Sequence, residues 1–330
     1  MLLTKSFLVL LMGFILSVVT GVILIPILRK LKTNQTLSVY LERSHSRKVG
    51  TPTIGGLIFI IPTLLLALSL VFLGKMRLSY NFIIVLFTFV SYGLIGFVDD
   101  YLIIKKRNNK GLSVNQKFFL QIVVSVLFFY LFMKGGNEPL FWIRFLNYKC
   151  NFGFIYGIFI LVVLVSSSNA VNLTDGLDGL ASGLSVIAFL AFSIIALNCD
   201  WLDGYIDIAL FGFMLVGSLL GFMMFNVSPA KIFMGDTGSL CLGATLGCFS
   251  ILTRFEVLLI VIGFVFVVET ITCIIQIFYY KLTGKRLFPI TPIHHSFERI
   301  GWSEKKIVKF FWFVGVVSAF VGLIIYFLFC

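Results

Sequence analysis

The stretch YGIFILVVLV, residues 156–165, carries no polar side-chain group except that of Tyr156. A helix suits such a run in a membrane because it satisfies every backbone N–H and C=O group internally. The stretch VNLTDGLDGLASG, residues 171–183, then introduces Asn172, Thr174, Asp175 and Asp178. The chain therefore places polar side chains where an apolar helix is expected to end.

The overall composition indicates the same environment. Hydrophobic residues make up 59% of the 330 positions, charged residues make up 12%, and the mean hydropathy is +1.07. A soluble protein of this composition could not cover its surface with polar groups. The apolar runs are long enough to cross a hydrocarbon core of about 30 Å and lack the alternation of barrel strands. We therefore predict an all-α polytopic membrane protein with a single domain over residues 1–330.

Ten membrane-spanning helices are expected from apolar runs of roughly 17 to 24 residues. They cover residues 6–28, 54–73, 80–98, 117–133, 154–171, 179–198, 206–225, 237–252, 255–278 and 310–329. The first run is too long for a signal-peptide core, and no small-residue cleavage pattern follows it, so it is kept as a span. An even number of spans places both termini on the same side of the membrane.

The distribution of positive charge predicts which side that is. Of the 26 lysines and arginines, 19 fall in one set of alternate loops. These loops are residues 29–53, 99–116 with Lys117 at the span edge, 172–178, 226–236 and 279–309. Because positive residues are retained in the cytoplasm, this set is predicted to be cytoplasmic and both termini to face outward. The charges are divided among loops between apolar spans, which argues against a nucleic-acid surface.

Several common motif spacings are missing from the chain. The six cysteines, at positions 150, 199, 241, 248, 273 and 330, show no CxxC or zinc-type spacing, and most lie in apolar runs. We therefore predict neither a disulfide nor a metal cage built from them. A Walker A sequence and a GxGxxG sequence are also missing, so an ATPase or a Rossmann enzyme is not supported.

Unusual polar residues gather on the predicted cytoplasmic face. They include three histidines, His45, His294 and His295, and five aspartates, Asp99, Asp100, Asp175, Asp178 and Asp236. Asp175 and Asp178 could instead cap the helix that begins near residue 179. Capping does not explain Asp99 and Asp100, which lie at the C-terminal end of a span, where the helix dipole disfavours negative charge. That pair is expected to need a cation, and the five aspartates are expected to form one site.

The same loops supply groups that suit an anionic ligand. The cations among them are Lys48, Lys117, Lys231, Lys285 and Arg286, and glycines that precede helices let backbone N–H groups approach a ligand. Carboxylates can hold a magnesium ion while cations and N–H groups hold phosphates. The pattern therefore favours a site for a magnesium-bound diphosphate.

Six stretches of loop sequence, in this order, resemble the polyprenyl-phosphate N-acetylhexosamine-1-phosphate transferase superfamily, and most closely its peptidoglycan branch. They are HSRKVGTPTIGG (45–56), GFVDDY (96–101), KGLSVNQK (110–117), NAVNLTDGLDGLA (169–181), FNVSPAKIFMGDTGSL (225–240) and GKRLFPITPIHHSFERIGWSE (284–304). Two positions depart from the family pattern. Ser296 stands where a third histidine is usual, and Ile103 stands where a lysine is usual.

The resemblance implies a reaction and its partners. It implies a bacterial plasma-membrane enzyme that transfers phospho-N-acetylmuramoyl-pentapeptide from UDP-N-acetylmuramoyl-pentapeptide to undecaprenyl phosphate, giving lipid I and UMP. It also implies a Mg²⁺ cofactor, a ten-span fold and an active site that faces the cytoplasm. One phosphoanhydride replaces another, so the reaction needs neither ATP nor hydrolytic water.

The matched positions imply roles for individual residues. The implied catalytic residues are Asp99, Asp100, Asp236, His294 and His295, and Asp236 is also the implied magnesium ligand. The implied substrate-binding residues are Lys48, Thr53, Lys117, Asn172, Asp175, Asp178, Asn226 and Phe233. The two histidines could act as metal ligands, as stabilisers of diphosphate charge or as structural groups of their loop.

Four questions stay open at this point. An aspartate could form a phosphoryl-enzyme, or the lipid phosphate could attack directly; the second is favoured because a phosphate monoester is already largely dianionic at pH 7. Glu269, on the same face of the ninth span as Gln276, could face a cavity or bond a neighbouring helix. A sister transferase with another UDP-sugar and a transporter with a midplane site are the alternative functions. The sequence does not distinguish a monomer from a homodimer.

Overall fold

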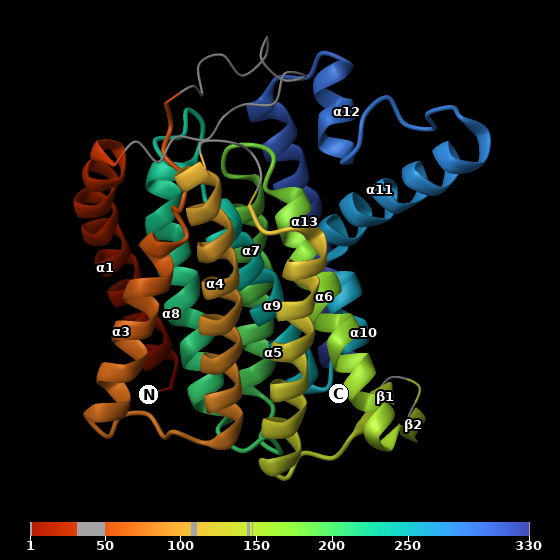
Figure 1. The fold of residues 1–330 in the computed structure, drawn as a ribbon. Helices are drawn as coiled ribbons and strands as arrows, with labels where there is room; N and C mark the ends of the chain where they lie inside the picture. Colours follow the sequence, from red (N-terminus) through yellow and green to blue (C-terminus); the bar gives the residue numbers. More distant parts are fainter. Residues whose placement is uncertain (1, 32–49, 107–110, 144–145, 147, 330) are drawn as a thin grey trace.

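Long apolar helices run side by side between the two ends of the molecule (Figure 1). The computed structural model describes residues 2–31, 50–106, 111–143, 146 and 148–329. The helices are α1 (Leu2–Lys30), α3 (Leu57–Phe72), α4 (Tyr80–Lys106), α5 (Val114–Lys134), α6 (Tyr156–Thr174), α7 (Leu180–Leu197), α8 (Tyr205–Asn226), α9 (Gly235–Thr253), α10 (Glu256–Ile262), α11 (Phe264–Thr283), α12 (Ile293–Arg299) and α13 (Glu304–Phe329). A 3-10 turn, η3 (Gly153–Ile155), leads into α6.

Each of the ten expected spans overlaps one of these helices or a pair of them. Within the described residues, eight helices are long and apolar enough to cross a membrane. The two expected spans outside that group are α3, with 16 residues, and α9. The side chains of α9 are buried without interruption from Thr237 to Thr253, so this helix contacts protein instead of lipid and can carry small and polar residues. The all-α membrane class is confirmed, while the count of ten and the orientation of the termini stay predictions.

The ninth expected span, residues 255–278, differs from the prediction of one continuous helix. It is divided into α10 and α11 at Gly263, whose N–H donates to the carbonyl oxygen of Leu259 and so closes the last turn of α10. A glycine favours such a break because it has no side chain to hold the helical conformation. After the break, α11 leaves the bundle obliquely (Figure 1).

A short β-hairpin was not predicted from the sequence. Strand β1 (Leu140–Ile143) pairs antiparallel with β2 (Tyr148–Asn151), with Leu140 opposite Asn151. Arg254 anchors the hairpin to the bundle, because its Nη1 donates to the carbonyl oxygen of Leu140 at 2.8 Å. The hairpin lies at the end of the bundle that also holds both termini (Figure 1).

Helix α9 forms the centre of the bundle. It packs chiefly against α4 and α6, while α1 packs against α8 at one side. The C-terminal ends of α4 and α6 and the N-terminal ends of α5 and α9 lie at the same end of the bundle, opposite the two termini (Figure 1). This arrangement gathers the polar loop residues of distant segments.

Candidate active site

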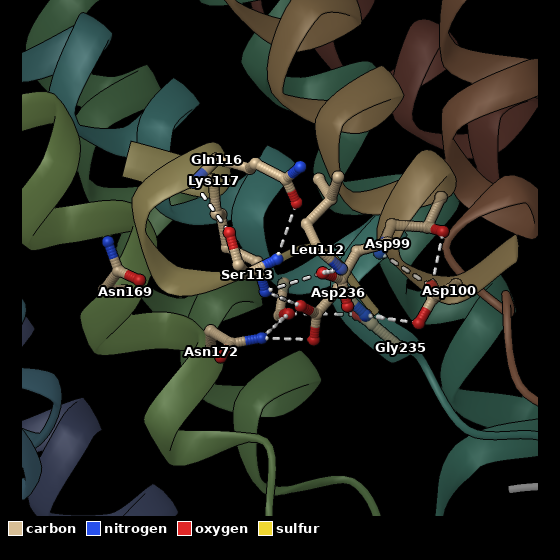
Figure 2. Close-up of polar contacts among 12 residues, drawn as sticks. Asp99, Asp100, Leu112, Ser113, Gln116, Lys117, Asn169, Asn172, Gly235 and Asp236 are labelled. Atoms are coloured by element: carbon tan, nitrogen blue, oxygen red, sulfur yellow. Dashed lines mark hydrogen bonds and ion pairs between the residues drawn. The ribbon is translucent and has the colours of Figure 1, made fainter. Parts of the chain in front are cut away.

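Four helix ends bring charged and amide side chains together (Figure 2). Asp99 and Asp100 come from the last two turns of α4, and Lys117 comes from the first turn of α5. Asn172 comes from the last turn of α6, and Asp236 from the first turn of α9. These five residues are called the aspartate–lysine cluster below. The sequence predicted all five as site residues.

Lys117 lies between two carboxylates of this cluster. Its Nζ is 2.5 Å from Oδ2 of Asp236 and 3.2 Å from Oδ1 of Asp99. The Asp99 side chain is 5% exposed and the Lys117 side chain 22%, so the three groups are partly shielded from water and attract one another more strongly than on a surface. With two carboxylates and one ammonium group, this part of the cluster keeps one negative charge in excess.

The start of α5 fixes the position of Lys117 relative to Asp99. Ser113 is the N-cap of α5, and its hydroxyl accepts a hydrogen bond from the backbone N–H of Gln116 while the Gln116 side chain accepts one from the Ser113 backbone. This reciprocal capping box fixes the first turn of the helix. The preceding residue, Leu112, donates its backbone N–H to Oδ1 of Asp99 at 2.9 Å. The segment that carries Lys117 is therefore tied directly to α4.

Asp100 does not contact Lys117 and instead binds the N-terminal end of α9. Its Oδ1 accepts a hydrogen bond from the backbone N–H of Asp236 at 3.2 Å. Its Oδ2 accepts two from Thr237, at 2.9 Å from the backbone N–H and 2.6 Å from the hydroxyl. The positive end of a helix stabilises a carboxylate at this position. The two adjacent aspartates thus find different positive partners, one a lysine and the other a helix terminus.

Asn172 fixes the other carboxylate oxygen of Asp236. Its Nδ2 donates to Oδ1 of Asp236 at 2.8 Å and to the hydroxyl of Ser239 at 2.9 Å. The Ser239 hydroxyl donates in turn to the carbonyl oxygen of Gly235 at 3.0 Å. These contacts join the end of α6 to the first turn of α9 and hold the Asp236 carboxylate between Asn172 and Lys117.

The segment before α3 lies beside the start of α9. Backbone hydrogen bonds join Phe233 to Pro52 and Gly55, and Met234 to Gly56, each at 2.9 Å. The side chain of Thr53 is buried next to Gly235 and Asp100. Thr53 and Phe233, both predicted to bind substrate, are therefore brought next to the aspartate–lysine cluster through the backbone.

Asp178 and Asn226 lie in a second group of contacts. Asp178 accepts a hydrogen bond from the Ala230 backbone at 3.0 Å and donates its own backbone N–H to Glu304 at 2.7 Å. Asn226 accepts from Ser182 at 2.8 Å and donates to the Ile232 carbonyl at 3.1 Å. Both side chains are buried, and these contacts join the loop before α9 to α7 and α13.

The alternative interpretation, in which Asp175 or Asp178 caps α7, is wrong. The N-cap of that helix is Gly179, with φ 83°, and it has no side-chain capping hydrogen bond. A left-handed backbone conformation of this kind favours glycine. Asp175 is instead the residue at which α6 ends, where its backbone N–H donates to the carbonyl oxygens of Val171 and Asn172. Lys48 and His45 lie outside the described residues.

The two predicted histidines form a third group, on α12. His294 is fully buried and its Nδ1 lies 3.2 Å from Oε2 of Glu269 on α11. His295 lies 2.6 Å from Oε2 of Glu298, and the two imidazole rings are 4.2 Å apart. The structure therefore divides the predicted site residues into three neighbouring groups at one end of the bundle instead of one continuous cluster.

Sequence reasoning missed several polar partners. Thr237 and Ser239 lie within the quoted stretch 225–240, but nothing in their spacing indicated that they bind Asp100 and Asn172. Glu304, which binds the Asp178 backbone, lies 126 residues away along the chain. Local patterns cannot reveal such contacts because they depend on how the helices pack.

The donor chemistry of the aspartate–lysine cluster fits a magnesium ion. Among the described residues, no group of three or more His, Cys, Asp or Glu side chains forms a preformed metal cage. Enzymes often hold Mg²⁺ with only one or two carboxylates, and substrate phosphates and water complete its shell. Asp99 and Asp236, with their excess negative charge beside Lys117, provide such a partial set.

Comparison with known proteins identifies the family. Residues 82–254 match the family described as Glycosyl transferase family 4. The phospho-N-acetylmuramoyl-pentapeptide-transferase of Bacillus licheniformis is 44% identical over 95% of this chain and 95% of its own length. The enzymes of the same name from Staphylococcus saprophyticus and Bacillus subtilis are 44% and 43% identical, over 91% and 96% of this chain and 93% and 96% of their own lengths. The stretches that carry the aspartate–lysine cluster are those on which the sequence resemblance rests, and this chain belongs to the phospho-N-acetylmuramoyl-pentapeptide-transferase family.

Proposed function

We propose that this protein synthesises lipid I in peptidoglycan biosynthesis. It transfers phospho-N-acetylmuramoyl-pentapeptide from UDP-N-acetylmuramoyl-pentapeptide to undecaprenyl phosphate and releases UMP. The observation that carries this proposal is the position of Lys117 between Asp99 and Asp236 at the end of the apolar bundle. A site at the end of a membrane bundle lets a lipid phosphate meet a water-soluble nucleotide.

An apolar groove supports a lipid acceptor. A cavity of about 230 Å³ is lined by residues of α6, α9, α10 and α11, including Ala170, Val171, Phe266 and Ile271. Ala170 and Val171 directly precede Asn172 of the aspartate–lysine cluster. A polyprenyl chain in this groove would bury apolar surface while its phosphate reached the cluster.

The proposed cofactor is Mg²⁺, held by Asp236. When bound, the ion would offset the negative charge of the diphosphate and help to orient it. Lys117 would supply a further positive charge from the same side, where it already binds both carboxylates. Asn172 keeps the Asp236 carboxylate in place through its hydrogen bond to Oδ1.

We favour direct attack by the lipid phosphate, because a phosphate monoester is already largely dianionic and Asp99 is engaged by Lys117 and Leu112. An oxygen of that phosphate forms a bond to the phosphorus that carries the sugar, and the old phosphoanhydride bond breaks. UMP leaves with the bridging oxygen, so one anhydride replaces another and no water is consumed. We propose that Asp99 orients the lipid phosphate or accepts its proton. Its carboxylate lies 3.2 Å from the ammonium group of Lys117, which would attract that phosphate. Asp100 positions Asp236 through the end of α9.

The remaining predicted residues surround this centre. Asp175, Asp178, Asn226, Phe233, Thr53 and Lys48 are proposed to bind the nucleotide half of the donor, and His294 and His295 to contact the diphosphate. The membrane is proposed to be the bacterial plasma membrane, with the site facing the cytoplasm. Most lysines and arginines belong to the same set of loops as the predicted site residues, and positive residues are retained in the cytoplasm.

A transfer assay tests the proposal. Purified protein is incubated with a radiolabelled UDP-sugar donor, undecaprenyl phosphate and Mg²⁺, and the lipid extract is counted. Label is expected in the lipid phase only with the muramoyl-pentapeptide donor. Transfer from UDP-N-acetylglucosamine would instead indicate a sister enzyme for another surface polymer. Transport of the donor without any lipid-linked product would reject the transferase.

A further inference from the structure

Glu269 and His294 form a buried carboxylate–imidazole pair outside the aspartate–lysine cluster. Both side chains are fully buried, and Oε2 of Glu269 lies 3.2 Å from Nδ1 of His294. Glu269 belongs to α11 and His294 to α12, so the pair joins two helices that meet at the end of the bundle where the cluster lies (Figure 1). A buried pair of ionisable groups is costly unless each group has a partner, which makes it a candidate for function.

The pair has unused hydrogen-bonding capacity. Among the described residues, neither carboxylate oxygen of Glu269 nor Nε2 of His294 has a hydrogen-bond partner. The 3.2 Å separation is an ion-pair distance without the geometry of a formed hydrogen bond. Buried polar atoms are nearly always satisfied in folded proteins, so unpaired ones point to a group that binds there.

The orientation of the His294 ring indicates where that group binds. Its Nδ1 edge faces Glu269, and its Nε2 edge faces Gly176, where an added methyl group would overlap Nε2. Gly176 lies between Asp175 and Asp178 in the loop that follows Asn172. The free ring nitrogen is therefore directed at the loop that links the aspartate–lysine cluster to the proposed nucleotide site.

The neighbouring histidine has its own carboxylate. His295 lies 2.6 Å from Glu298 within the same short helix, α12. Among the residues that the structure describes, the carboxylate facing His294 is therefore that of Glu269. Gln276, two turns after Glu269 on the same face of α11, accepts hydrogen bonds from the backbone N–H groups of Leu287 and Phe288. These bonds anchor the loop that leads to α12 and help to hold His294 beside Glu269.

We infer that Glu269 is a positioning residue that acts through His294. A carboxylate at Nδ1 holds an imidazole in one orientation and tautomer and stabilises the ring when it carries positive charge. Nε2 is then left to bind an anionic oxygen of the donor diphosphate or of the departing UMP. This inference rests on the proposed transferase function. It adds a residue of α11, on the far side of the ring from the substrate, to the catalytic apparatus.

A double-mutant cycle tests this role. The full-length enzyme is compared with Glu269→Gln, His294→Ala and the double variant in the lipid transfer assay, with kcat and the donor KM measured separately. Glu269→Gln is expected to lower kcat by roughly tenfold to 100-fold and to leave KM and the thermal midpoint near the wild-type values. The double variant is expected to be no slower than His294→Ala, because Glu269 has nothing to position once the ring is gone.

Glu256→Gln is the matched control. Glu256 is another buried glutamate, on α10, and its Oε1 accepts a hydrogen bond from Tyr156 at 2.7 Å, towards the opposite end of the bundle. The glutamine retains that acceptor, so kcat is expected to stay at the wild-type value. If Glu269→Gln does not fold, Glu269→Asp replaces it in the same cycle. A wild-type kcat in the Glu269 variant would overturn the inference. So would a double variant whose fold-loss in kcat equals the product of the two single-variant losses.

These outcomes are distinct from failure of the proposed function. If the chain is not the proposed transferase, the wild-type protein and Glu256→Gln also form no lipid-linked product. If only the role of Glu269 is wrong, both of these proteins remain active and the cycle shows no coupling.

Discussion

The carboxylate of Asp100 binds Thr237 through two hydrogen bonds to the same oxygen, from the backbone N–H at 2.9 Å and from the hydroxyl at 2.6 Å. The two residues lie 137 positions apart. Asp100 thus caps the first turn of α9 from the end of α4. This contact separates the roles of two adjacent aspartates, because Asp99 faces Lys117 while Asp100 holds the helix that carries Asp236.

Replacing Asp100 with asparagine is expected to lower both stability and activity. Asparagine keeps one acceptor oxygen but places an NH₂ group where the second oxygen accepts from α9, leaving a buried N–H group unsatisfied. The expected loss is about 2 kcal/mol of unfolding free energy. Thermal unfolding in detergent measures it. Asp99→Asn is the matched comparison and is expected to retain a higher midpoint while losing turnover; equal midpoints would contradict the capping role.

Asp236→Asn tests the proposed magnesium ligand. The asparagine oxygen can still accept from Asn172, so the fold is expected to persist while the charge beside Lys117 is lost. Transfer activity is expected to be abolished at every Mg²⁺ concentration tested. Thr245→Ala, further along the same helix, removes a hydroxyl that donates to the carbonyl oxygen of Cys241 within α9; it serves as the control and is expected to retain the wild-type magnesium midpoint. Near-normal turnover of Asp236→Asn across the titration would reject the assignment.

The choice between direct attack and a phosphoryl-enzyme is tested with delipidated enzyme. Direct attack predicts that no UMP is released from the donor, and that labelled UMP does not exchange into it, until undecaprenyl phosphate is added. The physical reason is that the dianionic lipid phosphate is already nucleophilic, whereas Asp99 is engaged by Lys117 and Leu112. Stoichiometric UMP release without lipid, together with a trapped phosphoryl-sugar on Asp99, would establish the covalent route instead.

The predicted orientation in the membrane is tested with two matched substitutions. Lys285→Cys lies in the loop after α11, at the end of the bundle that holds the candidate active site, and Lys75→Cys lies between α3 and α4 at the other end. In a background without reactive native cysteines, a membrane-impermeant thiol reagent applied to intact cells is expected to label position 75 only. Labelling of position 285 would show that the predicted orientation is wrong.

Sequence by itself determined the membrane class and most of the helices. Apolar length and the positions of loop charges are local properties, and each expected range overlaps a helix or a pair of helices. It also indicated that polar side chains such as Asp99 and Asn172 lie near the ends of apolar runs. The predicted loops that begin at residues 99 and 172 were wrong in detail, because α4 continues to Lys106 and α6 to Thr174, so both side chains lie within helices.

Only the tertiary structure decided which of these residues meet. Lys117 and Asp236 are 119 positions apart, and Asp100 and Thr237 are 137 apart, so no periodicity connects them. The break at Gly263 determines the path of α11, and α11 brings Glu269 to His294. These pairings follow from how whole helices pack around α9, because a side chain finds its partner only after the backbones that carry both are fixed.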